Sequence, residues 1–260
     1  MKDLNKTFIY KLALRIYQIK WFPKWIYLLG VNQFALLLIN DILKKKDLSE
    51  LRVKGYNNPI YLRGNTSDYK IFKQIFIEED HNLDIEFPVK SVIDAGSNCG
   101  YSVLYFAKKF ERAIIVAIEP DESNCEMIRK NTLNYRNVRL MQGGVWHRST
   151  NLSIKNKNAG KWAFQVQEVN EKDGEFKGYS IDEIMNLNNL NSIDFLKMDI
   201  EGSEKIVFTE NYKNWLPKIK YGIIELHEVY ANGVTETINT KLKEYNFKIS
   251  QAGKNLTFYK

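Results

Sequence analysis

The stretch Ser91-Val-Ile-Asp-Ala-Gly-Ser-Asn-Cys-Gly100 decides how we interpret the fold of this chain. An apolar strand ends here, and Asp94 lies at its carboxyl end. Gly96 and Gly100 allow the backbone to turn tightly, so we expect a helix to begin near Tyr101. The first turn of such a helix has free N–H groups, and a strand–turn–helix corner of this kind binds nucleotides in α/β proteins.

The order of residues in this turn narrows the class of ligand. It reads Asp-x-Gly-x-Asn-x-Gly, whereas a dinucleotide site usually reads Gly-x-Gly-x-x-Gly. Ser-Asn-Cys replaces the glycine-rich pyrophosphate turn, which disfavours a nicotinamide dehydrogenase. An acid at the head of the turn suits a ligand with hydroxyls and a positive end, such as S-adenosylmethionine.

From residue 89 onward, strand and helix patterns alternate, which predicts a parallel, doubly wound α/β sheet. The strand candidates are Val89–Ala95, Ile114–Glu119, Val138–Gln142, Ile193–Met198, Tyr221–Leu226, Phe247–Ser250 and Leu256–Tyr259. The helix candidates are Tyr101–Phe110, Glu122–Tyr135, Ser203–Glu210 and Thr235–Tyr245. The last two strands read as an antiparallel pair, the usual mark of the methyltransferase version of this sheet.

The positive charge of the chain is concentrated at one end. The 260 residues have a formal charge of +7, and residues 1–46 carry nine basic side chains against two acidic ones. The remainder is therefore neutral overall, which argues against a nucleic-acid groove on the sheet domain. Two cysteines, Cys99 and Cys125, predict neither a disulfide framework nor a zinc site.

We expect residues 1–50 to form a basic helical extension and residues 51–260 to form the main domain. Two amphipathic helices, divided near Phe22-Pro23, could lie on an anionic membrane surface. The alternative is a helical cap that packs on the sheet domain or on a second subunit of a homo-oligomer. The apolar run Trp25–Ile39 is shorter than a bilayer span. With no signal-peptide pattern, we expect a cytoplasmic protein, either free or at the inner face of the membrane.

Acidic residues follow three of the predicted strands, at the edge where a ligand crevice is expected. Asp94 ends the first strand, Glu119 ends the second, and Asp199 and Glu201 follow the fourth. A carboxylate at Glu119 can accept hydrogen bonds from the 2′ and 3′ hydroxyls of a ribose. Each acid could instead cap a neighbouring helix or loop, but their common position at strand ends favours a binding site.

Several motifs together resemble the FkbM family of S-adenosylmethionine-dependent methyltransferases. The most specific is Leu196-Lys-Met-Asp-Ile-Glu-Gly-Ser-Glu204, in which Ile200 and Ser203 replace the family's usual Val and Ala. The others are the turn already quoted, Ala117-Ile-Glu-Pro120, Ser180-Ile-Asp-Glu-Ile184 and Ile223-Ile-Glu-Leu-His227. The resemblance covers about residues 60–260 and implies a seven-stranded, Rossmann-like class I methyltransferase fold.

The resemblance also implies a cofactor, a reaction and a set of binding residues. The expected activity is O-methyl transfer from S-adenosylmethionine to a hydroxyl of a sugar, glycolipid or secondary metabolite, as in polysaccharide biosynthesis. Asp94, Gly96, Ser97, Asn98 and Gly100 would contact the methionine end of the cofactor. Glu119 would contact the ribose, and Gln142 and Gly143 would contact the adenine. Asp199 would lie beside the sulfonium.

A hydroxyl acceptor is a poor nucleophile, so we expect a general base. His227, after the fifth strand, is the first candidate, and Asp199 is its rival. The acceptor would lie near Trp146, His147, Lys161, Trp162, Glu201 and Glu225, and His147 is the second histidine candidate for the base. A metal could be held by Asp199, Glu201, Glu225 and His227, but their spacing fixes no geometry, so we expect none.

Two alternatives remain beside a glycan O-methyltransferase. The enzyme could methylate a small secondary metabolite or a protein side chain, and the shape of the acceptor pocket would distinguish these substrates. A non-catalytic binding protein of the same fold is the alternative from another class. The intact acids and glycines of the predicted cofactor site argue against it.

Overall fold

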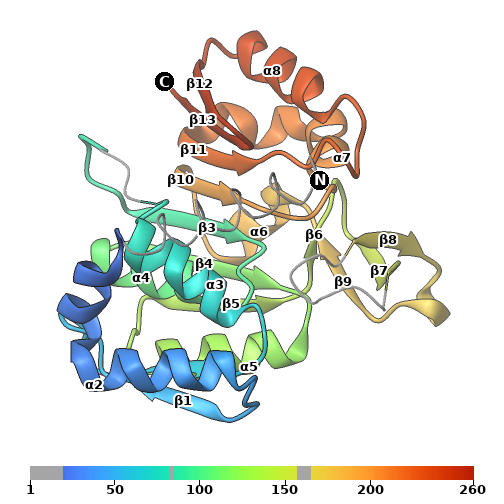
Figure 1. Ribbon diagram of the computed structural model, residues 1–260. Coiled ribbons are helices and arrows are strands. Elements are labelled where there is room, and N and C mark those ends of the chain that lie inside the picture. The colour runs from blue at the N-terminus through green and yellow to red at the C-terminus, as the bar shows by residue number, and fades with distance from the viewer. Residues whose placement is uncertain (1–19, 82–84, 157–164) are drawn as a thin grey trace, which may run out of the picture. The chain divides into compact units, whose positions relative to one another are not determined.

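The computed structural model describes residues 20–81, 85–156 and 165–260. Its chain divides into two compact units, Met1–Leu83 and Asp84–Lys260, which are described separately. The boundary expected at residue 50 stays a prediction. Both units appear in Figure 1.

The larger unit contains a seven-stranded sheet in the order β12-β13-β11-β10-β3-β4-β5. The strands are β3 (Ser91–Ala95), β4 (Ile114–Glu119), β5 (Val138–Gln142), β10 (Ile193–Met198), β11 (Ile219–Glu225), β12 (Lys248–Ala252) and β13 (Asn255–Tyr259). The five strands from β11 to β5 are parallel, and β13 pairs antiparallel with both β11 and β12. The predicted mostly parallel sheet with a closing hairpin is confirmed.

Helices pack on both faces of this sheet, as a doubly wound fold requires. They are α4 (Tyr101–Lys109), α5 (Glu122–Thr132), α6 (Ile181–Leu187), α7 (Glu204–Thr209) and α8 (Val234–Glu244). Alternate strand residues point to opposite faces. Ile93 of β3 belongs to a core cluster with apolar residues of α6, α7 and α8, whereas Phe195 of β10 contacts Phe106 of α4 at 5.0 Å between ring centroids.

A second, four-stranded sheet in the order β6-β9-β7-β8 was not predicted from the sequence. Its strands are β6 (Gly144–Val145), β7 (Thr150–Ile154), β8 (Val166–Val169) and β9 (Phe176–Tyr179). These strands are short, and most of their residues are at least partly exposed, so the sequence lacks a clear apolar alternation. The predicted acceptor residues Lys161 and Trp162 lie outside the described residues.

The smaller unit is built on the helix α2 (Phe22–Ile42) and a β1–β2 hairpin. Strands β1 (Leu48–Leu51) and β2 (Ile60–Arg63) pair antiparallel, and α3 (Asp68–Phe72) follows them. Trp25 of α2 is 2% exposed and stacks on the rings of Phe34 and Tyr69. Trp25 therefore packs inside this unit, whereas several other apolar residues of α2, among them Val31, Leu36 and Ile42, are exposed.

α2 is longer than the apolar run that the sequence suggested. By length and composition it could cross a membrane, and only 22% of its most apolar 18-residue window is buried. α2 begins at Phe22, beside the break that the sequence placed near Pro23, and it contains a further break at Gly30, whose φ is 73°. The expected helix before Pro23 lies almost entirely outside the described residues.

Candidate active site

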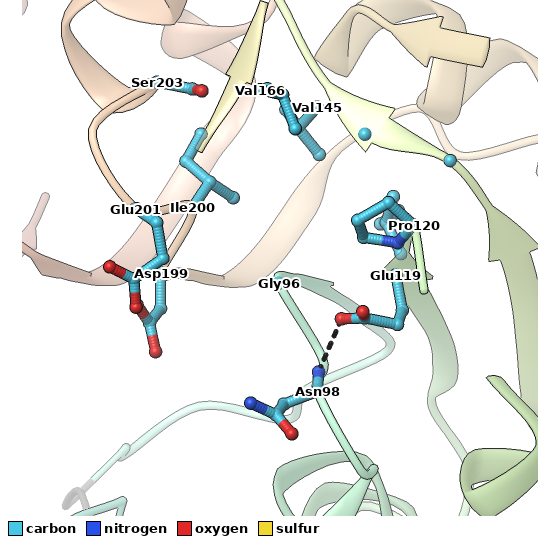
Figure 2. A pocket seen from close by; sticks show the side chains of 13 residues that line it. Gly96, Asn98, Glu119, Pro120, Val145, Val166, Asp199, Ile200, Glu201 and Ser203 are labelled. Carbon is cyan, nitrogen blue, oxygen red and sulfur yellow. Dashed lines mark hydrogen bonds between the residues drawn. The ribbon is translucent and has the colours of Figure 1, made fainter. Parts of the chain in front are cut away.

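A cavity lies at the carboxyl ends of β3, β4 and β10, where the sequence predicted a ligand crevice. Its volume is about 570 Å³, which includes space open to solvent. Figure 2 shows Asp199 and Glu201 on one side of this cavity and Glu119 and Pro120 on the other. Its lining residues are Gly96, Asn98, Ile118, Glu119, Pro120, Gly143, Gly144, Val145, Val166, Asp199, Ile200, Glu201 and Ser203.

The turn after β3 is fixed by its glycine and by β4. Gly96 has a φ of 80°, and the N–H groups of Gly96 and Ser97 both donate to the carbonyl of Ile118, at 3.1 and 3.0 Å. A Cβ atom on Gly96 would lie 1.8 Å from the carbonyl oxygen of Asp199. The loops after β3 and β10 therefore touch at a position that only glycine can occupy.

A buried ion pair between Asp94 and Lys197 stabilises this turn. Asp94 is fully buried and accepts a hydrogen bond of 2.5 Å from the hydroxyl of Ser102. Lys197 Nζ lies 3.3 Å from Asp94 Oδ1 and donates to the carbonyl of Gly96 at 2.6 Å. Burial favours neutral Lys197, but the charges of Asp94 and Asp199 outweigh it and raise the pKa of the lysine. Asp94 and Lys197 thus hold the loop in shape.

Glu119 is held in place before any ligand arrives. Its Oε2 accepts from the N–H of Asn98 at 2.9 Å, and its Oε1 accepts from the N–H of Asp121 at 3.0 Å and from Asn124 Nδ2 at 3.1 Å. Burial raises the pKa of Glu119 to about 7 despite these donors. A carboxylate offers about four acceptor sites. Glu119 therefore has room for roughly one ribose hydroxyl, rather than the two that the sequence suggested.

His227 lies among four carboxylates. Its Nδ1 is 2.8 Å from Glu204 Oε1, and its Nε2 is 3.4 Å from Glu201, 3.7 Å from Asp199 and 3.8 Å from Glu225. Burial lowers the pKa of His227, but the hydrogen bond to Glu204 and the surrounding charges outweigh it and raise this pKa to about 9. Burial raises the pKa of Glu201 to about 7.

The loop between β10 and α7 presents Glu201 to this cluster in a strained conformation. Glu201 has a φ of 52°, which is unfavourable for a side chain with a Cβ atom. Glu204 stabilises the loop from the start of α7, because its carboxylate accepts from the N–H groups of Ile200 and Gly202 at 3.1 and 2.9 Å. Backbone strain of this kind is often found at functional sites.

A wider groove adjoins the cavity, and Val166, Glu201 and Ser203 line both. The groove encloses about 890 Å³ that is open to solvent, and the half-buried ring of Trp146 and the exposed ring of Tyr230 line it. Its other lining residues are Lys155, Gln165, Gly202, Lys205, Ile206, Thr209 and Ala231. The cavity and the groove thus share Glu201 as part of their common wall.

The predicted cofactor residues divide into two groups. Gly96, Asn98, Glu119, Gly143 and Asp199 line the cavity. The others are not among its lining residues. Asp94 lies beneath the turn, and Ser97 Oγ donates to the carbonyl of Asp94. Gly100 precedes α4 with a φ of 85°, and Gln142 is exposed at the end of β5.

The predicted catalytic and acceptor residues also separate. Asp199, Glu201, Glu225 and His227 converge, and Trp146 lines the adjoining groove. His147 is buried elsewhere, 3.1 Å from Glu210. The sequence assigned no role to Lys197, Ser203 or Tyr230; the Leu196–Glu204 motif could have identified Lys197 and Ser203, whereas nothing marked Tyr230.

Comparisons with known proteins identify a family and several similar proteins. Residues 94–249 match the family model of the methyltransferase FkbM domain. "Methyltransferase 1" of Beauveria bassiana (strain ARSEF 2860) is 25% identical over 205 residues, which cover 69% of this chain and 81% of that protein. Among solved structures, a fibrillarin pre-rRNA processing protein from Methanococcus jannaschii is similar at a TM-score of 0.44 and 13% identity, covering 82% of this chain and 81% of that one. An O-methyltransferase from Bacillus cereus, in complex with SAH, is similar at a TM-score of 0.43 and 13% identity, covering 75% and 98%.

Proposed function

The chain belongs to the methyltransferase FkbM family, and from this premise we propose that it transfers a methyl group from S-adenosylmethionine to a hydroxyl oxygen of a sugar. The observation that carries the proposal is the shared wall of the two cavities. Val166, Glu201 and Ser203 line both the cavity at the strand ends and the adjoining groove. A donor in the one and an acceptor in the other would meet at Glu201, and such positioning supplies much of the rate of a displacement reaction.

The residues of the smaller cavity fit S-adenosylmethionine. Bound there, this cofactor would supply a methyl group on a positively charged sulfonium. Glu119 has an acceptor site left for a ribose hydroxyl, and Asp199 provides negative charge for a cationic centre. Gly143 and Gly144 line the cavity together with Ile118, where the adenine ring would lie.

The groove has the character of a sugar site. The rings of Trp146 and Tyr230 offer apolar faces, and Lys155, Gln165 and Thr209 add polar groups to its lining. Carbohydrates bind to such mixtures, because their C–H faces stack on aromatic rings while their hydroxyls form hydrogen bonds. The two aromatic residues thus favour a sugar over a small apolar metabolite.

The reaction needs a group that receives the proton of the hydroxyl. The acceptor oxygen forms a bond to the methyl carbon while the carbon–sulfur bond breaks, and sulfur keeps the electron pair. The hydroxyl proton passes to a base. His227 and Asp199 remain the candidate bases, since both converge with Glu201, but a pKa of about 9 means that His227 can accept the proton only in its neutral form, the minor form at neutral pH.

Titration calorimetry and a transfer assay test this proposal. Wild-type protein should bind S-adenosylmethionine and transfer its labelled methyl group to members of a panel of nucleotide sugars and glycolipid acceptors. Trp146→Ala should raise the KM for the acceptor and leave cofactor affinity unchanged, with the exposed Leu133→Ala as a control. Cofactor binding with transfer only to a metabolite or a protein would support the alternative substrates. Absence of cofactor binding would support a non-catalytic protein.

We also propose that α2 contacts an anionic membrane surface at the cytoplasmic face. Ile39 and Ile42 are 50% and 75% exposed, and three exposed lysines, Lys44–Lys46, follow directly. Apolar side chains beside lysines are typical of peripheral contact with anionic lipid. Ile39→Ser with Ile42→Ser should reduce flotation with phosphatidylserine vesicles, whereas Leu133→Ser should not; equal flotation of all three proteins would refute the contact.

A further inference from the structure

We propose that Asp199, Glu201, Glu225 and His227, here called the His227 cluster, bind a divalent metal cation. The sequence did not predict such a site, because the spacing of these residues along the chain fixes no geometry. The structure brings them together from the ends of β10 and β11. The role given below to the cation in methyl transfer rests on the proposed function, whereas the binding of the cation does not.

The separations of the potential ligand atoms suit a common cation. One ligand atom from each of Asp199, Glu201 and His227 lies within 4.8 Å of the other two. The contacts from His227 Nε2 to Glu201 and Asp199 are 3.4 and 3.7 Å, which is long for hydrogen bonds. Two atoms that each lie about 2.1 Å from one cation, at roughly right angles, are about 3 Å apart. A modest contraction would therefore enclose a cation.

The imidazole of His227 is the independent observation that points to a ligand. Its side chain is 6% exposed, and Glu204 engages only its Nδ1. Nε2 points at the carboxylates, and no hydrogen bond to it is found among the described residues. In the neutral imidazole, Glu204 favours the tautomer with the proton on Nδ1, and the lone pair of Nε2 then faces the cluster. A carboxylate that holds a histidine in this way is common behind metal ligands.

A second buried atom also lacks a hydrogen-bond partner. Asp199 Oδ1 is buried and forms no hydrogen bond within the described part of the chain. Unsatisfied carboxylate oxygens in the interior are costly, so such an atom calls for an explanation. Asp199 belongs to the same three-residue group as His227 Nε2. A cation between these two atoms would satisfy both.

The charge of the cluster favours a cation. Four carboxylates lie within 4 Å of the His227 ring, from Asp199, Glu201, Glu204 and Glu225. Lys197 lies 3.7 Å from Asp199 but also pairs with Asp94, and Lys254 reaches Glu225 only at 4.0 Å. Oxygen ligands suit Mg²⁺ and Mn²⁺, and an imidazole among them shifts the preference toward Mn²⁺.

The position of Glu201 connects the cation to the reaction. Glu201 lines both cavities, so a cation held there would contact a hydroxyl group in the groove. A divalent cation lowers the pKa of a bound hydroxyl and orients its oxygen. This would assist methyl transfer to a weakly nucleophilic sugar hydroxyl. Because His227 and Asp199 would then be ligands of the cation, the proton would leave to water and not to either of them.

Calorimetric titration of chelator-treated, full-length protein with MnCl₂ tests the site. We expect one Mn²⁺ per chain. Glu201→Gln should abolish measurable binding, and Glu204→Gln, a positioning variant, should weaken it roughly 10–100-fold, as for other residues behind metal ligands. Glu236→Gln, an exposed acid on α8, serves as the matched control and should bind as the wild type does. No binding by the wild type, or equal binding by all variants, would overturn the proposal.

Thermal unfolding provides a second readout that does not depend on activity. Mn²⁺ should raise the Tm of the wild type and of Glu236→Gln, but not that of Glu201→Gln, whose own Tm in chelator shows whether it is folded. If Mn²⁺ binds but no sugar is methylated, the cation site stands and the proposed function fails. If sugars are methylated at the same rate in chelator and no Mn²⁺ binds, the proposed function stands and this inference fails.

Discussion

Replacement of Gly96 by alanine tests whether contact between the loops after β3 and β10 shapes the cofactor cavity. The new Cβ atom would lie 1.8 Å from the carbonyl oxygen of Asp199 and 2.8 Å from its carbonyl carbon. Real Cβ atoms do not approach backbone so closely, so the loops would have to separate. Asp199 lines the cavity, and the substitution should therefore weaken cofactor binding as well as stability.

The size of the effect can be worked out in two parts. The left-handed backbone at Gly96, with a φ of 80°, costs alanine about 1–2 kcal/mol. Overpacking against a rigid neighbour adds about 1–3 kcal/mol. Gly253 isolates the first part, because its φ is 61° and a Cβ there would meet nothing within 4 Å. Gly96→Ala should thus be destabilised by about 2–5 kcal/mol and Gly253→Ala by only about 1–2 kcal/mol.

Urea unfolding of the two variants measures the difference, and calorimetry with S-adenosylmethionine measures the effect on the site. For a unit of this size, about 3 kcal/mol corresponds to a fall in Tm of roughly 6–12 °C. Gly253→Ala should bind the cofactor as the wild type does. If Gly96→Ala is no less stable than Gly253→Ala and binds the cofactor equally well, the contact between the loops does not shape the cavity.

Three further predictions concern single side chains. The pKa of Glu119 is raised from 4.5 to about 7, so the stability that this group contributes is full below pH 4.5 and is lost as the pH rises through 7. Between pH 5 and pH 8 the wild type should lose about 3 kcal/mol more unfolding free energy than Glu119→Gln; parallel pH profiles would contradict this. Lys197→Met leaves Asp94 buried without its cation and should cost about 3–5 kcal/mol in urea unfolding; a loss below about 1 kcal/mol would show that the pair is dispensable. Trp25→Ala removes a buried ring and should destabilise the smaller unit by about 3–5 kcal/mol. Circular dichroism during unfolding measures this change, and an unchanged unfolding transition would refute the role of the aromatic stack.

The main sheet could be predicted because its strands carry strong local signals. Ile114–Glu119, Val138–Gln142 and Ile193–Met198 have the bounds that the sequence indicated. The first is buried except for its partly exposed Ile114, the third is buried throughout, and both end in acids or turns. The four-stranded sheet could not be predicted in the same way, because its strands are short and include many exposed polar residues. The break at Gly30 was missed because one glycine within an apolar run does not by itself specify a positive φ.

The candidate site was predicted by position more readily than by role. Acids at strand ends were expected near one another, and Glu119 and Asp199 do line one cavity. Asp94 has the right sequence position but is a buried residue of β3, where it pairs with a buried lysine from the neighbouring strand. The partner of His227 could not be foreseen, since Glu204 is 23 residues away along the chain and only the fold brings the two together.

One carboxylate, that of Glu204, orders the whole edge of the candidate site. It holds the amides of Ile200 and Gly202 and one nitrogen of His227. The conformational entropy of this loop, about 1–2 kcal/mol for each residue, is therefore lost when the protein folds and not when a ligand binds. A ligand that meets Glu201 finds it already oriented, so little of its binding free energy is consumed in ordering the loop. Conservative substitutions at position 204 should therefore lower ligand affinity while the fold is still unchanged.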